Sequence, residues 1–325
     1  MCIVLSGETQ PDTTKLMNVP VVVDGVKSNF FMYINNFDLN KPIMNSNMNK
    51  FNQNKFNSLL DYKDNGMFSR LYQDLNTFNL KDKLGDNSSI MVVPFAVDPH
   101  TPTSQIGLVD ISTNEMKKLR KNIESLKPVS KSYMYTNLSR SLSFDSSKKL
   151  EVHKVGNYNI TVATSRTKLL NNIDWTKFTK PDDYEKRVST FENKNLYPNK
   201  YAYFYIVASA IENIKDDGFG IVYPRLSDGN IYIPTAHEDT SQTHEFDVEL
   251  FAFGKNLHNR KNLHNGMISN VSDKSVCYDF LSEISDINVK ILNNTYKKMD
   301  FDKDINTFYY DKIEGMEKNH NIFLN

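Results

Sequence analysis

The dipeptide Asp228-Gly229 constrains the fold of this chain more than any other short feature. It separates two runs rich in β-branched and aromatic residues, 219–227 and 230–237. Asp-Gly favours a type I′ turn, whose two central residues need positive φ angles and which joins neighbouring antiparallel strands. A third such run, 244–254, follows a short polar loop. We therefore predict a meander of strands over residues 219–254.

Two other dipeptides carry the same hairpin signal, Asp24-Gly25 and Gly156-Asn157. After the second, Tyr158, Ile160 and Val162 alternate with smaller or polar residues, which is the period of a strand with one buried face. We predict hairpins at both places. Further strands are predicted at residues 2–6, 90–97, 201–210 and 287–292.

The clearest helical pattern covers residues 113–127. Its apolar residues Met116, Leu119, Ile123 and Leu126 recur at helical spacing. Ser112 and Glu115 fit a capping box before it, and Pro128 follows it as a stop. Additional helices are predicted at residues 67–78, 165–173, 181–192 and 275–284.

These elements predict an α+β fold that is strand-dominated, with mostly antiparallel sheets and a few packed helices. The 325 residues are enough for one large domain or two ordinary ones. We expect one β-rich unit over residues 1–325, with an internal boundary near 139–149 as the alternative. We interpret residues 45–57 as an Asn-rich insertion and residues 255–325 as a segment appended to the core.

The bulk composition bounds the partners and the compartment. Formal net charge is zero, whereas proteins that track nucleic-acid phosphates carry a basic excess, so nucleic acid is not expected as a partner. Only Cys2 and Cys277 are present, which favours a reducing, cytoplasmic location over a disulfide framework. No apolar run of roughly 18 residues predicts a membrane span, and the first residues lack the pattern of a secretory signal. Abundant Asn and Lys are typical of AT-rich genomes, including those of large DNA viruses. We therefore consider a component of a virion as a second location beside the cytoplasm.

The densest set of ligand-type side chains surrounds the loop at 238–243. His237, Asp239, His244 and Asp247 could hold zinc or another divalent metal if the loop brings them together. The spacing matches no defined zinc motif. The alternative is an ordinary strand with one solvated face, since acidic residues alternate with apolar ones: Glu245, Asp247 and Glu249 against Phe246, Val248 and Leu250.

Cys2 is a candidate nucleophile. Removal of Met1 would leave it with an α-amine of pKa roughly 7.7–8.0, near enough to neutrality to act as its base. The alternative is a cysteine that packs as a small hydrophobe in a strand.

The segment 300–311 echoes a calcium-binding loop, with acidic residues at Asp300, Asp302, Asp304 and Asp311. Ile305 occupies the place where such a loop uses Gly for its sharp turn, and no Glu closes it. The alternative is that Phe301 and Ile305 are the apolar positions of an exposed edge.

Four short motifs occur in one order along the chain: Cys2, Met91 to Phe95, Lys154 to Val162, and Ile233 to His237. This order resembles a set of uncharacterised bacterial proteins with an N-terminal Cys strand, a V-V-P-F strand, a V-G-x-Y hairpin and a P-T-x-H strand. The resemblance covers roughly residues 1–254. It implies a shared architecture and carries no known activity.

The sequence leaves two functions open. The first is a non-enzymatic intracellular structural or binding protein, a component of a larger assembly that meets a protein partner or copies of itself. The second is a hydrolase that uses Cys2 or a metal held by His237 and His244. No standard phosphate loop, nucleophile elbow, C-x-x-C pair or H-E-x-x-H motif occurs, and no cofactor is assured.

Overall fold

The structure, a computed structural model, describes residues 3–4, 14–37, 90–109, 111, 113–127, 149–211, 214–236, 243–257, 267–271, 275–285, 287–291, 296–318 and 320–324. Its described helices are α3 (Thr113–Leu126), α4 (Arg166–Asn171), α5 (Tyr184–Ser189) and α6 (Ser275–Ser285), with the short 3-10 helices η1 (Thr103–Gln105) and η2 (Thr190–Glu192). The strands are β1 (Ile3–Val4), β2 (Thr14–Val23), β3 (Val26–Phe37), β4 (Ile90–Val97), β5 (Gly107–Val109), β6 (Val152–Val155), β7 (Tyr158–Ala163), β8 (Ala202–Ala210), β9 (Ile214–Pro224), β10 (Ile231–Ile233), β11 (Thr243–Gly254), β12 (Met267–Asn270), β13 (Asn288–Ile291), β14 (Tyr296–Phe301), β15 (Thr307–Lys318) and β16 (Ile322–Leu324).

The strands form a nine-stranded sheet in the order β12-β15-β11-β2-β14-β13-β5-β9-β3 and a five-stranded sheet in the order β1-β4-β8-β7-β6. A small sheet pairs β10 with β16. Among the described strands, β2 and β11 make the one parallel pairing, and the other pairings are antiparallel. The predicted strand-dominated α+β fold is confirmed.

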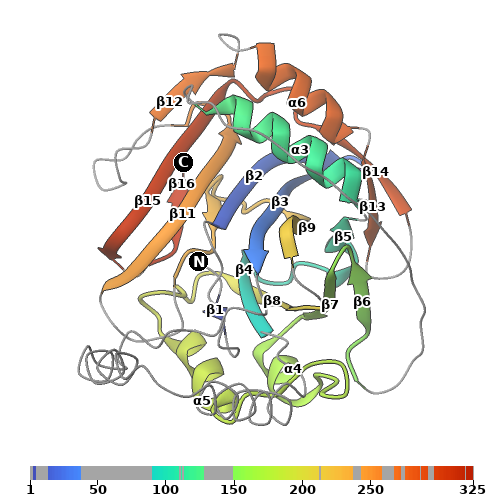
Figure 1. Cartoon of the computed structure of the whole chain (residues 1–325), viewed down its shortest axis with the longest axis vertical. Coiled ribbons are helices and arrows are strands. Elements are labelled where there is room, and N and C mark those ends of the chain that lie inside the picture. The colour runs from blue at the N-terminus through green and yellow to red at the C-terminus, as the bar shows by residue number, and fades with distance from the viewer. Residues whose placement is uncertain are drawn as a thin grey trace, which may run out of the picture.

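Part of the large sheet closes on itself. Strand β3 pairs with β9 on one side and with β2 on the other. Because β2 also pairs with β14, the strands β2, β14, β13, β5, β9 and β3 form a ring of pairings. The first half of β2 pairs with β11 instead, so the pair β11–β15 leaves the ring as a long ribbon, drawn in orange and red in Figure 1.

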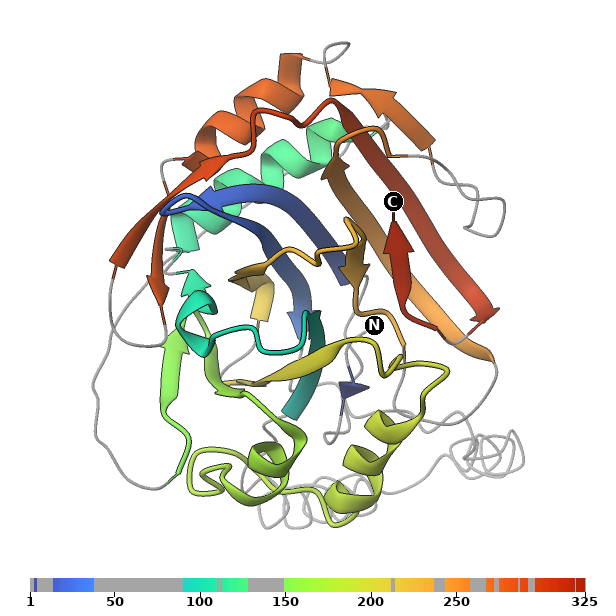
Figure 2. The same cartoon turned by 180° about the vertical axis from the view of Figure 1, so that it is seen from behind.

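The sheets and helices stack in layers, with α3 and α6 at one end of the molecule and α4 and α5 at the other (Figure 1). One face of the large sheet packs with α3 and α6, through residues such as Phe30, Ile123 and Phe280. Its other face meets the five-stranded sheet, where Phe31 and Phe95 lie edge to face with ring centroids 5.0 Å apart. The far side of the five-stranded sheet is covered by α4 and α5, and Figure 2 shows the same order from behind.

The two hairpins predicted from local turn chemistry are confirmed. Val23 pairs with Val26 across Asp24 and Gly25, whose φ angles are 49° and 77°. Val155 pairs with Tyr158 across the Gly156 turn. In the first turn both central residues adopt the left-handed conformation, and in the second Gly156 does so, with a φ of 53°.

The predicted meander over 219–254 is wrong, although its strands exist. β9 pairs with β3 and β5, β10 pairs with β16, and β11 pairs with β15 and β2. Asp228 and Gly229 do lie in a turn, which the Gly229 N–H closes on the Leu226 carbonyl at 3.0 Å. The Asp228 carboxylate links this turn to another segment, because it accepts hydrogen bonds from Tyr201 Oη at 2.6 Å and Lys200 Nζ at 2.9 Å. The residues of the turn therefore determine only the local chain reversal, whereas contacts between distant segments determine which strands pair.

The helix at 113–127 is confirmed as α3, with Met116, Leu119, Ile123 and Leu126 at most 2% exposed. The helix at 181–192 is shorter than predicted, because α5 begins at Tyr184 and the last residues form η2. α6 buries Cys277, as its apolar stripe predicts. The predicted helix at 67–78, the Asn-rich insertion at 45–57, Ser112, and residues 139–148 of the suggested boundary lie outside the described residues.

The C-terminal residues contribute strands throughout the large sheet. β15 pairs with β11 along its whole length, while β13 and β14 complete the ring beside β5 and β2. Within the part of the chain that the structure describes, no helix is long and apolar enough to cross a membrane.

Candidate functional site

Three of the residues singled out from the sequence, Cys2, His237 and Asp239, lie outside the described residues. The strand expected after Cys2 is present over Ile3–Val4, where Ile3 pairs with Val92 of β4. The nucleophile hypothesis for Cys2 therefore stays a prediction.

The acidic and apolar residues of β11 alternate across its two faces. Phe246, Val248 and Leu250 are at most 3% exposed and belong to the core between the sheets. Asp247 is half-buried on the opposite face, and the backbone of His244 pairs with Glu317 of β15. The described residues contain no group of three or more His, Cys, Asp or Glu that could hold a metal ion. Since His237 and Asp239 are not among them, the metal site also stays a prediction.

Glu249, the last acidic residue of that alternation, is 6% exposed and held by two cations. Lys15 Nζ lies 2.8 Å from one of its carboxylate oxygens, and Lys127 Nζ lies 2.7 Å from the other. Burial alone would raise the pKa of Glu249, but the hydrogen bonds from Lys127 and Lys15 outweigh it and hold the pKa below its ordinary value. Burial would lower the pKa of the Lys15 amine, but its hydrogen bond to Glu249 and the nearby carboxylate charges outweigh this effect and raise the pKa above its ordinary value. This cluster joins the start of β2 and the end of α3 to β11.

The carboxylates at 300–311 do not form a calcium loop, so that interpretation is wrong for these residues. Asp311 lies on β15, 4% exposed, and accepts a hydrogen bond from Tyr309 Oη at 2.8 Å. Asp302 lies in the turn between β14 and β15, where its carboxylate accepts the backbone N–H of Asp304 at 3.0 Å. The turn is an Asx-type turn at the end of a strand, and its negative charge is met by side-chain cations from other strands.

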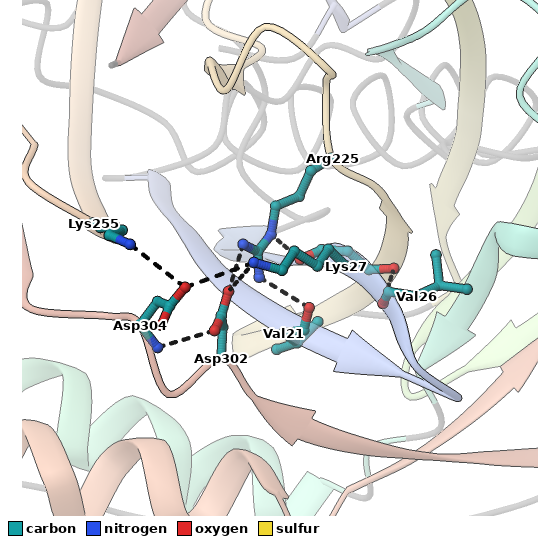
Figure 3. Close-up of polar contacts among 8 residues, drawn as sticks. Val21, Val26, Lys27, Arg225, Lys255, Asp302 and Asp304 are labelled. Carbon is teal, nitrogen blue, oxygen red and sulfur yellow. Dashed lines mark hydrogen bonds and ion pairs between the residues drawn. The ribbon is translucent and has the colours of Figure 1, made fainter.

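The principal cation is Arg225, which follows β9 (Figure 3). Its guanidinium donates from Nη1 to Asp302 Oδ2 at 2.6 Å, from Nε to the Ser28 carbonyl at 2.9 Å and from Nη2 to the Val21 carbonyl at 3.0 Å. These acceptors belong to the β14–β15 turn, β3 and β2. Arg225 thus links the end of β9 to β3, β2 and the β14–β15 turn with three charge-assisted hydrogen bonds. We call this meeting point of the four segments the seam of the strand ring.

Two exposed lysines complete the cluster in Figure 3. Lys27 Nζ lies 3.7 Å from Asp304 Oδ2 and 4.0 Å from Asp302 Oδ2, and Lys255 Nζ lies 3.7 Å from Asp304 Oδ2. Burial would raise the pKa of Asp302, yet the Asp304 N–H and the Arg225 guanidinium hold it below its ordinary value. A carboxylate kept ionised by a guanidinium exchanges no proton near neutral pH, so the cluster suits structural fastening better than acid–base catalysis.

Sequence reasoning did not single out Arg225. Its partners lie roughly 80 to 200 positions away along the chain, since the separations are 77 residues to Asp302 and 204 to Val21. The one local cue was its position directly after Pro224, where β9 ends. That cue predicts the end of a strand and gives no partner.

The described structure also contains a sheet edge that is only partly covered. β15 pairs with β11 from Thr307 to Lys318 on one side, whereas on the other side β12 pairs only with Thr307 to Tyr310. Residues 311–318 therefore have no strand partner on that side among the described residues. Figure 1 shows β15 as the long outer strand with β12 at its upper end. β12 is itself exposed, with Met267 at 44% and Ile268 at 37%.

The uncovered part of β15 is charged and has one irregular backbone position. Lys312 and Glu314 project on one face as an exposed ion pair 2.5 Å apart, and Lys318 is exposed on the same strand. Gly315 has a φ of 85°. Charges and irregular backbone on an edge disfavour indiscriminate pairing with other strands.

Comparison with known proteins gives no family for the chain. No family model matches it, and no curated protein matches it. The crystal structure of baculovirus P35 is 12% identical, with 100% of this chain and 99% of that chain covered and a TM-score of 0.41. A mutated baculovirus P35 after caspase cleavage is 13% identical over 97% and 99%, with a TM-score of 0.39, and P35 in the caspase-8/P35 complex is 13% identical over 97% and 96%, with a TM-score of 0.39. Identities and TM-scores of this size establish neither a common fold nor a common function.

Proposed function

We propose that this chain is a non-enzymatic protein-binding protein, a component of a larger assembly, that pairs an extended segment of a partner protein with the outer edge of β15. The observation that carries the proposal is that the two edges of β15 are paired over different lengths. Its inner side is paired along twelve positions, while the described strand on its outer side, β12, reaches only four of them.

Strand addition supplies affinity from the main chain and selectivity from the side chains. The partner would run antiparallel to β15, in line with β12, and so meet residues 311–318. Lys312 and Glu314 then call for an acidic and a basic residue two positions apart in the partner, and Lys318 calls for a second acidic residue four positions from the basic one, because opposite charges directly across a ladder attract and like charges repel. The buried Ile313 on the other face anchors the edge in the core.

The same features distinguish a partner from a second copy of this chain. A second β15 that covered residues 312–318, paired antiparallel about Gly315, would place Lys312 opposite Lys318, with like charges facing each other. A register about Ile313 avoids this conflict but pairs only residues 311–315. A different protein with complementary charges has no such conflict. We therefore assign the edge to a partner protein, with self-association as the competing outcome of the test.

The experiment compares two double variants, in each of which the two charges of an exposed ion pair on a strand swap places. Lys312→Glu combined with Glu314→Lys reverses the order of charges along the edge of β15. Lys298→Asp combined with Asp300→Lys reverses a matched pair on β14, which lies between β13 and β2. Both variants keep net charge and composition.

The tagged chain is expressed in its native cells, and the proteins that it retains are identified by mass spectrometry. The retained partner is then purified, and its binding to each variant is measured. We expect the edge variant to bind the partner about tenfold more weakly, as reversing two facing charge pairs costs about 1–2 kcal/mol, and the β14 variant to bind normally. Equal binding by both variants, or a strict monomer in light scattering with no retained partner, would contradict the proposal.

A further inference from the structure

A second feature lies on the face of the large sheet that meets the five-stranded sheet, and it concerns polar groups in the core. Asn18 of β2, Asn29 of β3 and Tyr223 of β9 are 0%, 1% and 0% exposed. Asn29 pairs directly with Tyr223, and Asn18 lies opposite Phe31, two residues further along β3. Because alternate residues of a strand share a face, the three polar side chains gather on one face of three neighbouring strands. We call them the buried amide cluster.

The hydroxyl of Tyr223 is the centre of this cluster. It accepts a hydrogen bond from Asn18 Nδ2 at 3.0 Å and lies 3.3 Å from the Tyr232 carbonyl, to which it donates. Asn29 lies directly opposite Tyr223 on the neighbouring strand. The hydroxyl carries a single proton, and the Tyr232 carbonyl accepts it.

The two amide oxygens are left over. Asn18 Oδ1 and Asn29 Oδ1 are buried and have no hydrogen-bond partner among the described protein atoms. Exchanging the oxygen and nitrogen of either amide does not remove the difficulty, because the single Tyr223 proton can serve only one acceptor. An unsatisfied carbonyl in an apolar core is costly, and most buried polar groups in proteins therefore have a partner.

We propose that the buried amide cluster binds internal water, which donates hydrogen bonds to Asn18 Oδ1 and Asn29 Oδ1. Water suits the cluster because it carries two donors, is small enough for an interior site and commonly satisfies buried acceptors of this kind. Asn18 hydrogen-bonds the Tyr223 hydroxyl and Asn29 pairs directly with Tyr223, so both amides lie on one face of neighbouring strands, where one or two water molecules would serve their oxygens. The site is independent of the proposed partner edge, and it ties β2, β3 and β9 on the inner face near the point where Arg225 ties them at the seam.

A crystal structure of the full chain at high resolution tests the proposal directly. We expect an ordered water within about 2.7–3.2 Å of Asn18 Oδ1 or Asn29 Oδ1. Oxygens that accept hydrogen bonds from protein donors instead, or a dry site with no density beside them, would overturn it.

Oxygen-17 relaxation dispersion supplies a second test in solution, since it counts water molecules held for long times inside the protein. The double variant Asn18→Leu with Asn29→Leu should lose the signal of at least one such water. The control is Asn35→Leu, which removes a buried asparagine whose amide already donates to Thr14 Oγ1 and Tyr33 Oη, and it should keep that signal. An unchanged signal in a folded double variant contradicts the proposal, and if that variant does not fold, the crystal structure decides.

Discussion

Arg225 and Asp302 meet at the seam of the strand ring, with 2.6 Å between Nη1 and Oδ2, although 77 residues separate them in the sequence. The Asp302 side chain is 9% exposed and that of Arg225 is 23% exposed. The pair is thus largely shielded from water, and Arg225 donates further hydrogen bonds to two strand carbonyls. Through these three contacts Arg225 connects the end of β9 with β3, β2 and the β14–β15 turn.

Replacing Arg225 by Met should destabilise the fold by about 2–3 kcal/mol, because Asp302 would keep its charge in a largely buried position and two strand carbonyls would lose a donor. Urea unfolding measures the change. The control is Lys298→Met, which breaks the exposed ion pair with Asp300 and should cost no more than about 0.5 kcal/mol. Equal losses in the two variants would show that the Arg225 contact has no special role at the seam.

The ion cluster around Glu249 predicts a pH-dependent difference in stability between the native chain and the variant Glu249→Gln. The pKa of Glu249 is lowered in the folded chain, so its contribution is fully present above the ordinary glutamate pKa of about 4.3 and is lost as pH falls through the lowered folded value. We expect the variant to be less stable by about 2 kcal/mol at neutral pH. Denaturant titrations from pH 7 down to about pH 3 should show the two curves converging, and a constant gap would count against the assignment.

Two glycines of the large sheet should respond differently to alanine. A Cβ at Gly218 would collide with the Tyr33 carbonyl on the neighbouring strand, whereas a Cβ at Gly315 meets nothing within 4 Å. The backbone contact at Gly218 cannot relax without moving β9 away from β3, so Gly218→Ala should cost about 3 kcal/mol or more. Gly315→Ala should cost about 1–2 kcal/mol from its positive φ alone. Thermal unfolding that ranks them in the reverse order would argue against this close approach of the strands.

Asn321 fastens the C-terminal strand to the body of the protein. It is 7% exposed, its Oδ1 accepts the backbone N–H groups of Thr235 and Ala236 at 3.1 Å each, and its Nδ2 donates to the Leu196 carbonyl at 2.8 Å. Asn321→Ala should cost about 2–3 kcal/mol, since it leaves buried backbone groups unsatisfied. Hydrogen exchange should then accelerate across β10 and β16 before it accelerates in β2. Uniform acceleration throughout the chain would show that the strand pair is not a separate unit.

The sequence predicted what local chemistry decides. Asp24-Gly25 and Gly156-Asn157 sit in hairpins because positive φ angles and short loops leave adjacent strands little choice of partner. The position of α3 was also predictable from its own segment, because the spacing of Met116, Leu119, Ile123 and Leu126 matches the period of a helix with one buried face. The fold class follows from these elements.

Pairings between distant segments were beyond such reasoning. The turn at Asp228-Gly229 gave no sign that β10 would pair with the C-terminal strand β16, or that β11 would run parallel to β2. Arg225 looked like any arginine at the end of a strand. Glu249 was recognised as part of an alternating acidic strand face, yet its lysine partners come from β2 and the end of α3, and only the tertiary structure brings them together.

Hydrogen–deuterium exchange of the full chain, alone and with its captured partner, tests the central claim most directly. In the free chain, we predict that alternate amides of residues 311–318, those that point away from β11, exchange faster than the amides of β2, which is paired on both sides. On binding, the same positions should become protected, and the Lys312→Glu, Glu314→Lys variant should lose that protection. Protection that falls elsewhere while residues 311–318 stay unchanged would contradict strand addition at the edge of β15.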